Sequence, residues 1–231
     1  MRAKELIAEE RKAGTKIVSE IKSKEILESI GMPTTGGLIV KSEEEAVKAA
    51  EKIGYPVVLK IHSPDISHKS DVGGIKIQLV NKQMVSDAYK SILATVSKKR
   101  PEAKIEGINI QKMAPAGVEV IIGTTTDSTF GPVIMFGMGG VLAELIKDVS
   151  FRVIPINKGD ADSMVREIKG FPILEGYRGS EGVDLVSLRD ALLKVSELVE
   201  QCPEIMEMDI NPIFATPKGI VAADSRIVLK R

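Results

Sequence analysis

Two pairs of strand-like segments, each pair joined by a short turn, most constrain how this chain can fold. VEVIIGTT and PVIMFG flank the connection at 127–131, and EIMEMDINPIFA and GIVAADSRIVL flank the turn at 217–219. Strands that are joined so closely pair antiparallel, whereas parallel strands need a long crossover. Helix-like segments are mixed with these hairpins instead of alternating with single strands. The order predicts an α+β fold with largely antiparallel sheets.

The composition is that of an ordinary globular chain, and it excludes several classes of protein. Hydrophobic residues make up 43% of the 231 positions, and 32 basic residues balance 32 acidic ones. This balance gives no electrostatic reason to expect a nucleic-acid or acidic-membrane partner. No apolar run approaches the roughly 20 residues of a membrane span, and the charged N-terminal segment does not resemble a signal peptide. Cys202 is the single cysteine, so a disulfide framework is impossible and we expect a cytoplasmic protein.

Helix signals divide the chain further. The charged, amphipathic N-terminal segment predicts a helix from Ala3 to Ser19, and Ser23 resembles the N-cap of a second helix that ends at Gly31. Ser42, followed by three glutamates, predicts another capped helix. Later helices are predicted at 84–98, 160–168 and 187–200.

The segment QKMAPAG, which contains Met113, combines proline and glycine and is typical of a hinge. We therefore expect a first lobe at 1–112 and a second lobe at 113–231. A crevice between two small lobes is a natural ligand site.

Lys60 lies inside an apolar strand-like run, VVLKIH. A lysine in that position either reaches solvent along its flexible stem or meets an anion such as a nucleotide phosphate. The residues alone leave both interpretations open.

The polar stretch 63–74 connects two strands and is longer than an ordinary connection, which favours a functional loop. Gly73 and Gly74 would let the backbone approach a phosphate and present its N–H groups. His68 stands in the middle of this loop beside Lys69. It is either an ordinary solvated side chain or a covalent nucleophile whose cationic neighbour attracts phosphate.

Asn211 and Asp224 lie on the two segments of the last hairpin, which can bring their side chains together. A pair of oxygen ligands suits Mg²⁺, which keeps several waters and shares its other positions with phosphates. An Asx turn before Pro212 and a surface aspartate would explain the same residues without a metal. The FGMGG turn at 136–140 is by itself a weak signal, since tight glycine turns are common.

HKSDVGG, the run from VEVIIG to ELIKDVSFR, EGYRG and EMDINP together resemble the β subunit of archaeal ADP-forming acetyl-CoA synthetases. More broadly, they resemble the ATP-grasp half of the nucleoside-diphosphate-forming acyl-CoA synthetases. The resemblance extends from about Ser23 to Arg231. It implies an ATP-grasp fold, with two α/β lobes and the nucleotide in the cleft between them.

The resemblance also implies nucleotide contacts for particular residues. Lys60 would contact the phosphates of ATP or ADP, and the loop of Gly73 and Gly74 would lie over them. The backbone of Met113 would meet the adenine, and Glu119 would lie near the ribose.

The resemblance implies a metal site and a catalytic histidine as well. Asn211 and Asp224 would hold Mg²⁺, and His68 would receive a phosphoryl group transiently. Three further residues fall in a family motif without an assigned role: Glu144, Asp148 and Arg152.

The function implied is that of the ATP-handling subunit of an ADP-forming acyl-CoA synthetase, of the acetate–CoA ligase (ADP-forming) type. Acyl-CoA, ADP and phosphate would give the acid, ATP and CoA, reversibly and through phosphohistidine. The CoA-binding half of the family is missing from this sequence, so the resemblance implies an α subunit that carries the main phosphohistidine, in an α2β2 complex. The start at Met1 and the end after a complete strand favour a natural subunit over a fragment.

Two alternatives remain open from the sequence. One is an ATP-grasp ligase that activates a carboxylate directly, without phosphohistidine. The other is a nucleotide-sensing regulatory subunit. The sequence does not indicate the acyl group, the choice between ADP and GDP, or the number of subunits.

Overall fold

The computed structural model describes residues 2–66, 68–140 and 146–230. They form two compact units, one at Thr35–Met113 and one that combines Met1–Thr34 with Ala114–Arg231. Each unit has its own cluster of buried apolar side chains. Within these ranges, no helix combines the length and the apolar character needed to cross a membrane.

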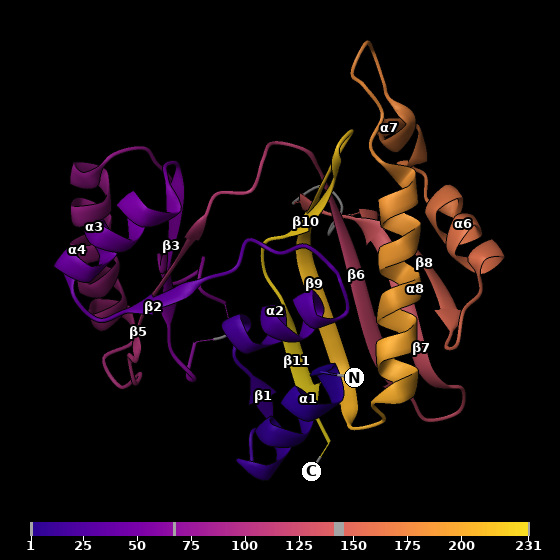
Figure 1. Cartoon of the computed structure of the whole chain (residues 1–231), viewed down its shortest axis with the longest axis horizontal. Helices are drawn as coiled ribbons and strands as arrows, with labels where there is room; N and C mark the ends of the chain where they lie inside the picture. Colours follow the sequence, from indigo (N-terminus) through magenta and orange to yellow (C-terminus); the bar gives the residue numbers. More distant parts are fainter. Residues whose placement is uncertain (1, 67, 141–145, 231) are drawn as a thin grey trace. The chain divides into compact units, whose positions relative to one another are not determined.

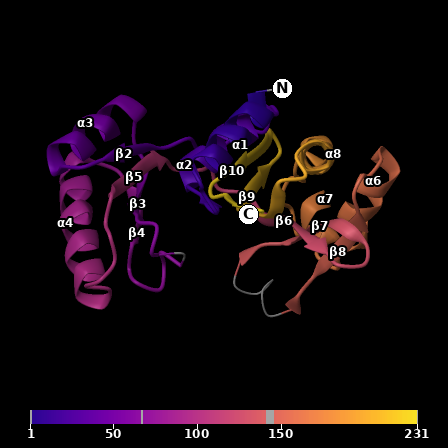
Figure 2. The ribbon, with the colours of Figure 1, turned by 90° about the horizontal axis from the view of Figure 1, so that it is seen from below.

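The unit at Thr35–Met113 is an antiparallel sheet with two helices on one face. Among the described residues its four strands lie in the order β2-β5-β3-β4. Helices α3 and α4 lie side by side (Figure 1), and Figure 2 shows α4 running beside the strands. The elements are β2 Leu38–Val40, α3 Glu43–Ile53, β3 Val57–His62, β4 Ile75–Leu79, α4 Lys82–Lys99 and β5 Gly107–Lys112.

The other unit is built on a larger antiparallel sheet. In the part of the chain that the structure describes, its order is β1-β11-β9-β6-β7-β8, and β10 pairs with β9 as a branch. Five helices are described in this unit, and they lie on one face of the sheet (Figure 1). Their buried side chains form one core cluster with those of the strands. The strands are β1 Ile17–Val18, β6 Val118–Asp127, β7 Gly131–Met138, β8 Val149–Val153, β9 Ile205–Thr216, β10 Gly219–Ala222 and β11 Arg226–Leu229. The helices are α1 Arg2–Lys12, α2 Glu20–Ser29, α6 Lys158–Glu167, α7 Phe171–Glu175 and α8 Leu185–Gln201.

The predicted antiparallel hairpins are present. β7 pairs with β6 along its whole length, and the Asp127 carboxylate accepts the N–H groups of Thr129 and Phe130 at 2.7 and 2.9 Å, which closes the turn. The last segment differs from the prediction, because it forms two strands instead of one. β10 and β11 both pair with β9, and the chain bends between them.

The N-terminal helices differ from the prediction. Helix α1 ends at Lys12 instead of Ser19, because Gly14 adopts a positive φ of 74° that breaks the helix. Ser19, and not Ser23, caps α2 by accepting the N–H of Lys22. Ser23 is buried within α2, where its hydroxyl donates to the carbonyl oxygen of Val18.

The division of the chain also differs from the predicted lobes. Residues 1–34 were expected in the first lobe, but they pack with Ala114–Arg231. β1 pairs with β11 near the C-terminus, and buried side chains of α1 and α2 join the core of that unit. The pairing joins segments about 200 residues apart, so no local sequence signal reveals it.

Helix capping was predicted in part. Ser42 caps α3 by accepting the N–H of Glu45 at 3.1 Å, as expected. Three later helices begin a few residues before the predicted positions, and an Asx side chain caps each one. The capping residues are Asn81, Asn157 and Asp184.

Candidate functional site

Lys60 lies in the middle of β3 on the face of the sheet that points away from α3 and α4. Its sequence neighbours Leu59 and Ile61 belong to the apolar core, so its own side chain takes the opposite face. Asn109 of β5 is its cross-strand partner, and Gln111 lies two residues further along β5. All three polar residues are buried, Lys60 with 6% of its surface exposed. A lysine in these surroundings does not extend into bulk solvent and is suited to meet an anion.

His68 is exposed on the loop between β3 and β4, and the loop is attached to the unit on its N-terminal side. Ile66 inserts into the apolar core of the unit, with 5% of its surface exposed. Just before it, the Asp65 carboxylate accepts the N–H of Lys104 at 2.8 Å. The loop therefore presents His68 to solvent two residues beyond a buried anchor.

A tight turn attaches the other side of the loop. The N–H of Gly73 donates to the carbonyl of Ser70 at 3.0 Å, and the N–H of Gly74 donates to that of Lys69 at 2.8 Å. A Cβ at Gly74 would lie 2.5 Å from Cγ2 of Ile61, so only glycine fits there. Both amides are used inside the turn. The expectation that these N–H groups point at a phosphate therefore does not hold in this structure.

Met113 directly follows β5, the last strand of its unit. Its N–H donates to the carbonyl oxygen of Pro56 at 3.1 Å. An adenine at this position would therefore meet the carbonyl oxygen or the side chain of Met113 and not its amide.

Glu119 is half-buried near the start of β6, and the glycine run after β7 packs against it. The N–H of Gly139 donates to the Glu119 carbonyl at 2.7 Å, and a Cβ at Gly139 would lie 3.0 Å from the Cβ of Glu119. A Cβ at Gly140 would lie 3.6 Å from one of its carboxylate oxygens. The glycines thus leave room beside the Glu119 side chain.

The structure brings Asn211 and Asp224 onto adjacent backbone segments. β10 and β11 both pair with β9, and the bend 223–225 between them lies against the middle of β9. There the N–H of Ala223 donates to the carbonyl oxygen of Pro212 at 2.9 Å. Because Asn211 precedes Pro212 and Asp224 follows Ala223, the two predicted ligands come from neighbouring segments, Asn211 from β9 and Asp224 from the bend between β10 and β11.

Asp209 is a further residue at this position that the sequence analysis missed. It is the cross-strand partner of Arg226. Asp209 is exposed, but the protein around its carboxyl group displaces some of the water, and Asp224 and Glu207 repel its charge; these effects raise its pKa, and Arg226 opposes them. The D-x-N spacing of Asp209 and Asn211 was the available signal, since alternate residues of a strand share a face.

No cluster of three His, Cys, Asp or Glu side chains arranged to hold a metal ion occurs among the described residues. A cation at Asp209 and Asp224 would therefore need other oxygen donors. The amide of Asn211 and the phosphates of a nucleotide are donors of the kind that Mg²⁺ prefers.

Two residues of the unassigned family motif hold structure together. The Asp148 carboxylate accepts the backbone N–H groups of residues 169–170 at 2.7 and 2.6 Å. Arg152 donates to the carboxylate of Glu167 at the end of α6. Arg152 therefore joins β8 to α6, and Asp148, just before β8, joins the chain to the segment after α6. Glu144 lies outside the described residues.

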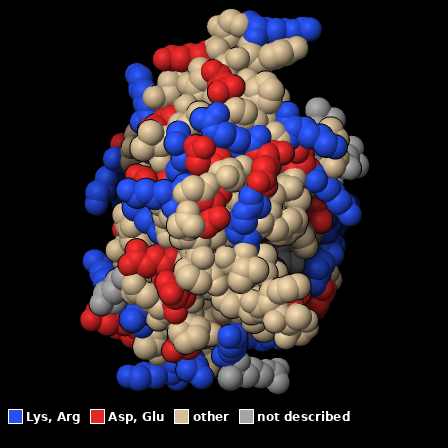
Figure 3. All heavy atoms as spheres, turned by 90° about the vertical axis from the view of Figure 1, so that its right-hand side faces the viewer, with Lys and Arg blue, Asp and Glu red and all other residues tan. Residues whose placement is uncertain are grey.

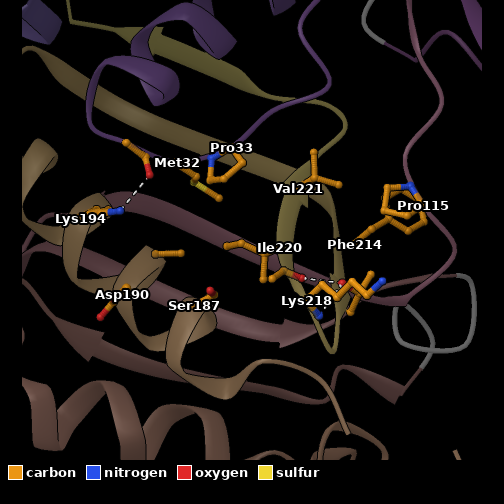
Figure 4. Close-up of a pocket in the computed structure, with 14 residues that line it drawn as sticks. Met32, Pro33, Pro115, Ser187, Asp190, Lys194, Phe214, Lys218, Ile220 and Val221 are labelled. Atoms are coloured by element: carbon orange, nitrogen blue, oxygen red, sulfur yellow. Dashed lines mark hydrogen bonds between the residues drawn. The ribbon is translucent and has the colours of Figure 1, made fainter. Parts of the chain in front are cut away.

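A cavity of about 400 Å³ lies in the unit that contains the larger sheet (Figure 4). Lys194 of α8 reaches across one side of it and donates to the carbonyl oxygen of Gly31 at 2.8 Å. Pro115 and Phe214 lie together on the other side in Figure 4. Phe214 is the cross-strand partner of Glu119, so this side of the cavity adjoins the position predicted for the ribose.

The predicted site residues fall into two groups. Lys60, His68 and the two loop glycines belong to the unit at Thr35–Met113, which Met113 ends. Glu119 and the two predicted metal ligands belong to the other unit.

Comparison with known proteins identifies relatives along the whole chain. Residues 9–229 match the family model for an ATP-grasp domain. The chain is 47% identical to the acetate–CoA ligase [ADP-forming] I subunit beta of Pyrococcus furiosus, over 99% of this chain and 98% of that protein. It is 44% identical to the acetate–CoA ligase [ADP-forming] I of Archaeoglobus fulgidus, over 99% of this chain but only 33% of that longer protein.

Among solved structures, the chain is similar to acetyl-coenzyme A synthetase 1 of Ca. Korarchaeum cryptofilum. The TM-score is 0.86 at 42% identity, over 99% of this chain and 100% of that one. That protein was solved with coenzyme A and Mg-AMPPCP, with its phosphohistidine segment pointing towards the nucleotide binding site.

Proposed function

This chain belongs to the ATP-grasp family, as the ATP-handling subunit of an ADP-forming acyl-CoA synthetase, and from this we propose that His68 carries a phosphoryl group to and from its nucleotide. The overall reaction converts acyl-CoA, ADP and phosphate into the acid, ATP and CoA. The CoA-binding chemistry belongs to a partner α chain that carries the main phosphohistidine, and the two chains form an α2β2 complex.

The nucleotide contacts come from side chains suited to each part of ADP. Lys60 offsets phosphate charge, because its ammonium group is held on a polar sheet face with little access to water. The carbonyl oxygen of Met113 accepts from the adenine amino group. Pro115 and Phe214 offer an apolar surface for the base, next to Glu119, which accepts from the ribose hydroxyls.

Asn211, Asp224 and Asp209 form an oxygen-rich group that fits Mg²⁺. Two carboxylates that repel each other, with an amide oxygen beside them, are matched to a hard divalent cation. When bound, Mg²⁺ supplies positive charge next to the phosphoryl group. The three side chains would hold the ion at the nucleotide phosphates, because the two carboxylates without a cation would repel them.

His68 acts as the covalent carrier. A ring nitrogen of His68 attacks the phosphorus held by the partner's histidine, and the old P–N bond breaks as the new one forms. An oxygen of the terminal phosphate of ADP then attacks the same phosphorus, and the imidazole of His68 leaves with the electron pair of the P–N bond. Lys69, the next residue, offers a positive charge to the phosphoryl oxygens.

The observation that carries this proposal is the exposure of His68 on a loop that is attached at both ends. Ile66 is buried on one side and the glycine turn lies on the other. A nucleophile that must meet groups on two protein chains needs to be accessible, and the loop presents it to solvent.

The test compares the two histidines of the chain. His68→Ala, assayed with the partner chain for ATP formation from acyl-CoA, ADP and phosphate, should lower kcat by at least about 100-fold. His62→Ala is the matched control, because His62 is 3.6 Å from Glu106 in the same unit and has no role in transfer. Full turnover in His68→Ala would refute the relay.

A second comparison tests the metal site. Asn211→Ala should lower turnover strongly while the affinity of the chain for ADP without metal changes little, because Asn211 acts through Mg²⁺. A loss of ADP affinity with unchanged kcat would assign Asn211 to nucleotide binding alone.

A further inference from the structure

The face of the larger sheet that points away from its helices is divided into two halves. A row of cross-strand partners runs across it from Arg226 through Asp209, Gly123 and Met135 to Phe151. Residues directly opposite each other share a face. The strand neighbours of this row belong to the core on the other side: Ile122, Ile134, Phe136, Met208 and Ile227.

The half on β7 and β8 is apolar. Val133 and Met135 of β7 lie opposite Val153 and Phe151 of β8, and we name these four residues the β7–β8 apolar face. Phe151 and Val153 expose 54% and 49% of their surfaces. The other half of this face carries the charged residues Arg226 and Asp209. The Met135 side chain extends toward that half, since its Cε lies 3.2 Å from where a Cβ would stand at Gly123.

The β7–β8 apolar face also adjoins an open sheet edge. β8 ends the sheet in the part of the chain that the structure describes, so one side of its backbone has no strand partner there. Proteins normally cover an edge strand that carries exposed apolar side chains, because it otherwise promotes aggregation. Figure 3 looks from the side of α6 and β8 and shows an uncharged area below a surface of mixed charges.

The lengths of the relatives indicate what covers this face. The chain spans 98% of the Pyrococcus subunit but 33% of the single-chain Archaeoglobus ligase. In that longer protein the ATP-grasp part is joined to about twice its own mass of further protein. If the function proposed above holds, an equivalent body reaches this chain as a separate partner and must bury part of its surface.

We propose that the β7–β8 apolar face is the docking surface for the CoA-binding partner chain, a deduction that rests on the proposed function. Asp209 and Phe151 are three strand spacings apart on the same face, which is about 14 Å. A partner seated on Phe151 therefore lies beside the residues that hold Mg²⁺ and the nucleotide phosphates. Docking there would place the partner chain, which carries the main phosphohistidine, next to the side chains that hold Mg²⁺.

The experiment measures binding between this chain and its CoA-binding partner by calorimetry. Phe151→Glu should weaken binding at least tenfold, because it places a charge in the centre of an apolar contact. Val153→Lys is a second variant at the same face. Ile77→Glu is the matched control, since Ile77 is a strand residue of the other unit with 60% of its surface exposed; its affinity should stay within about twofold.

Circular dichroism and ADP binding by the isolated chain report whether each variant is folded. Binding of folded Phe151→Glu and Val153→Lys with the affinity of Ile77→Glu would overturn the proposal. A second result would also overturn it: the wild-type chain is a dimer by itself, and Phe151→Glu makes it monomeric without lowering its affinity for the partner chain. The face would then bind a second copy of this chain.

The outcomes separate this inference from the proposed function. A wild-type pair that binds through Phe151 but never phosphorylates His68 would refute the relay and leave the docking surface intact. A relay that operates with unchanged affinity in both face variants would refute the docking surface alone.

Discussion

The burial of Ile66 predicts how far and how often the His68 loop opens. His68 is two residues beyond Ile66, and a chain spans at most about 3.6 Å per residue, so the Cα atom of His68 stays within about 7 Å of that of Ile66. Visits to two chains therefore require release of the Ile66 side chain from the core. Ile66→Ala should make this release more frequent.

The size of the effect follows from the buried side chain. Ile66→Ala removes three carbon atoms from a side chain that is 5% exposed, and each is worth about 0.8 kcal/mol of burial. The closed loop should lose about 2.4 kcal/mol, which raises the open population roughly 50-fold at about 1.4 kcal/mol per factor of ten.

Hydrogen exchange of individual amides measures this opening. The N–H groups of Gly73, Gly74 and Lys104 are bonded only while the loop is closed, so their exchange should accelerate roughly 50-fold in Ile66→Ala. Ile92→Ala, at a fully buried position of α4, is the control and should leave the loop amides unaffected. Acceleration of less than about threefold in Ile66→Ala would refute the view that Ile66 holds the loop.

Three further outcomes are expected from buried polar and titratable groups. Lys24→Met should destabilise the fold by about 3–5 kcal/mol in urea unfolding, since it leaves Glu20 buried without its 2.9 Å ion-pair partner, whereas changing both residues to apolar ones should cost much less. Burial, and then the charge of Glu204, raises the pKa of the Cys202 thiol, so the stability that it contributes is present below the unfolded pKa of about 8.5 and lost as pH rises above it. Cys202→Ala should show a shallower fall in melting temperature at alkaline pH, and an equal slope would contradict this. Asp148→Ala should cost about 2–4 kcal/mol in thermal unfolding, because two backbone N–H groups lose their acceptor; a change below about 0.5 kcal/mol would show that water replaces it.

The features that the sequence predicted correctly have local causes. The hairpin between β6 and β7 follows from Asp127 and Gly131 in its turn, and the start of α3 follows from Ser42. The ATP-grasp fold followed from motifs spread along the chain, and the family match supports it. Each of these signals is contained in a few consecutive residues.

The features that were missed depend on distant parts of the chain. β1 has two residues and exists because β11 pairs with it, so no window around Ile17 reveals it. Ser23 is a residue type that commonly caps helices. The chain enters α2 directly from β1, however, so the helix begins earlier and Ser19 is its N-cap. Tertiary pairing overrides local preference in both cases.

The candidate site shows the same contrast. The residue types of Lys60 and Asn211 were sufficient to select them as candidates. The structure adds that Lys60 is buried and that the bend containing Asp224 lies beside Asn211. Asp209 was missed because its importance arises from Asp224, which lies in the bend between β10 and β11 and far from it in the sequence pattern. The amides of Gly73 and Gly74 were expected to be available, but the turn that they form uses them.

The most direct test of the account is to follow a phosphoryl group through the protein. The chain would be incubated with γ-labelled ATP and Mg²⁺, alone and with its CoA-binding partner, and the position and chemical stability of the label determined. The account predicts acid-labile, alkali-stable label on His68 that passes to the partner chain. Nucleotide binding without label on the protein in either setting would contradict it and would favour direct activation of a carboxylate by ATP.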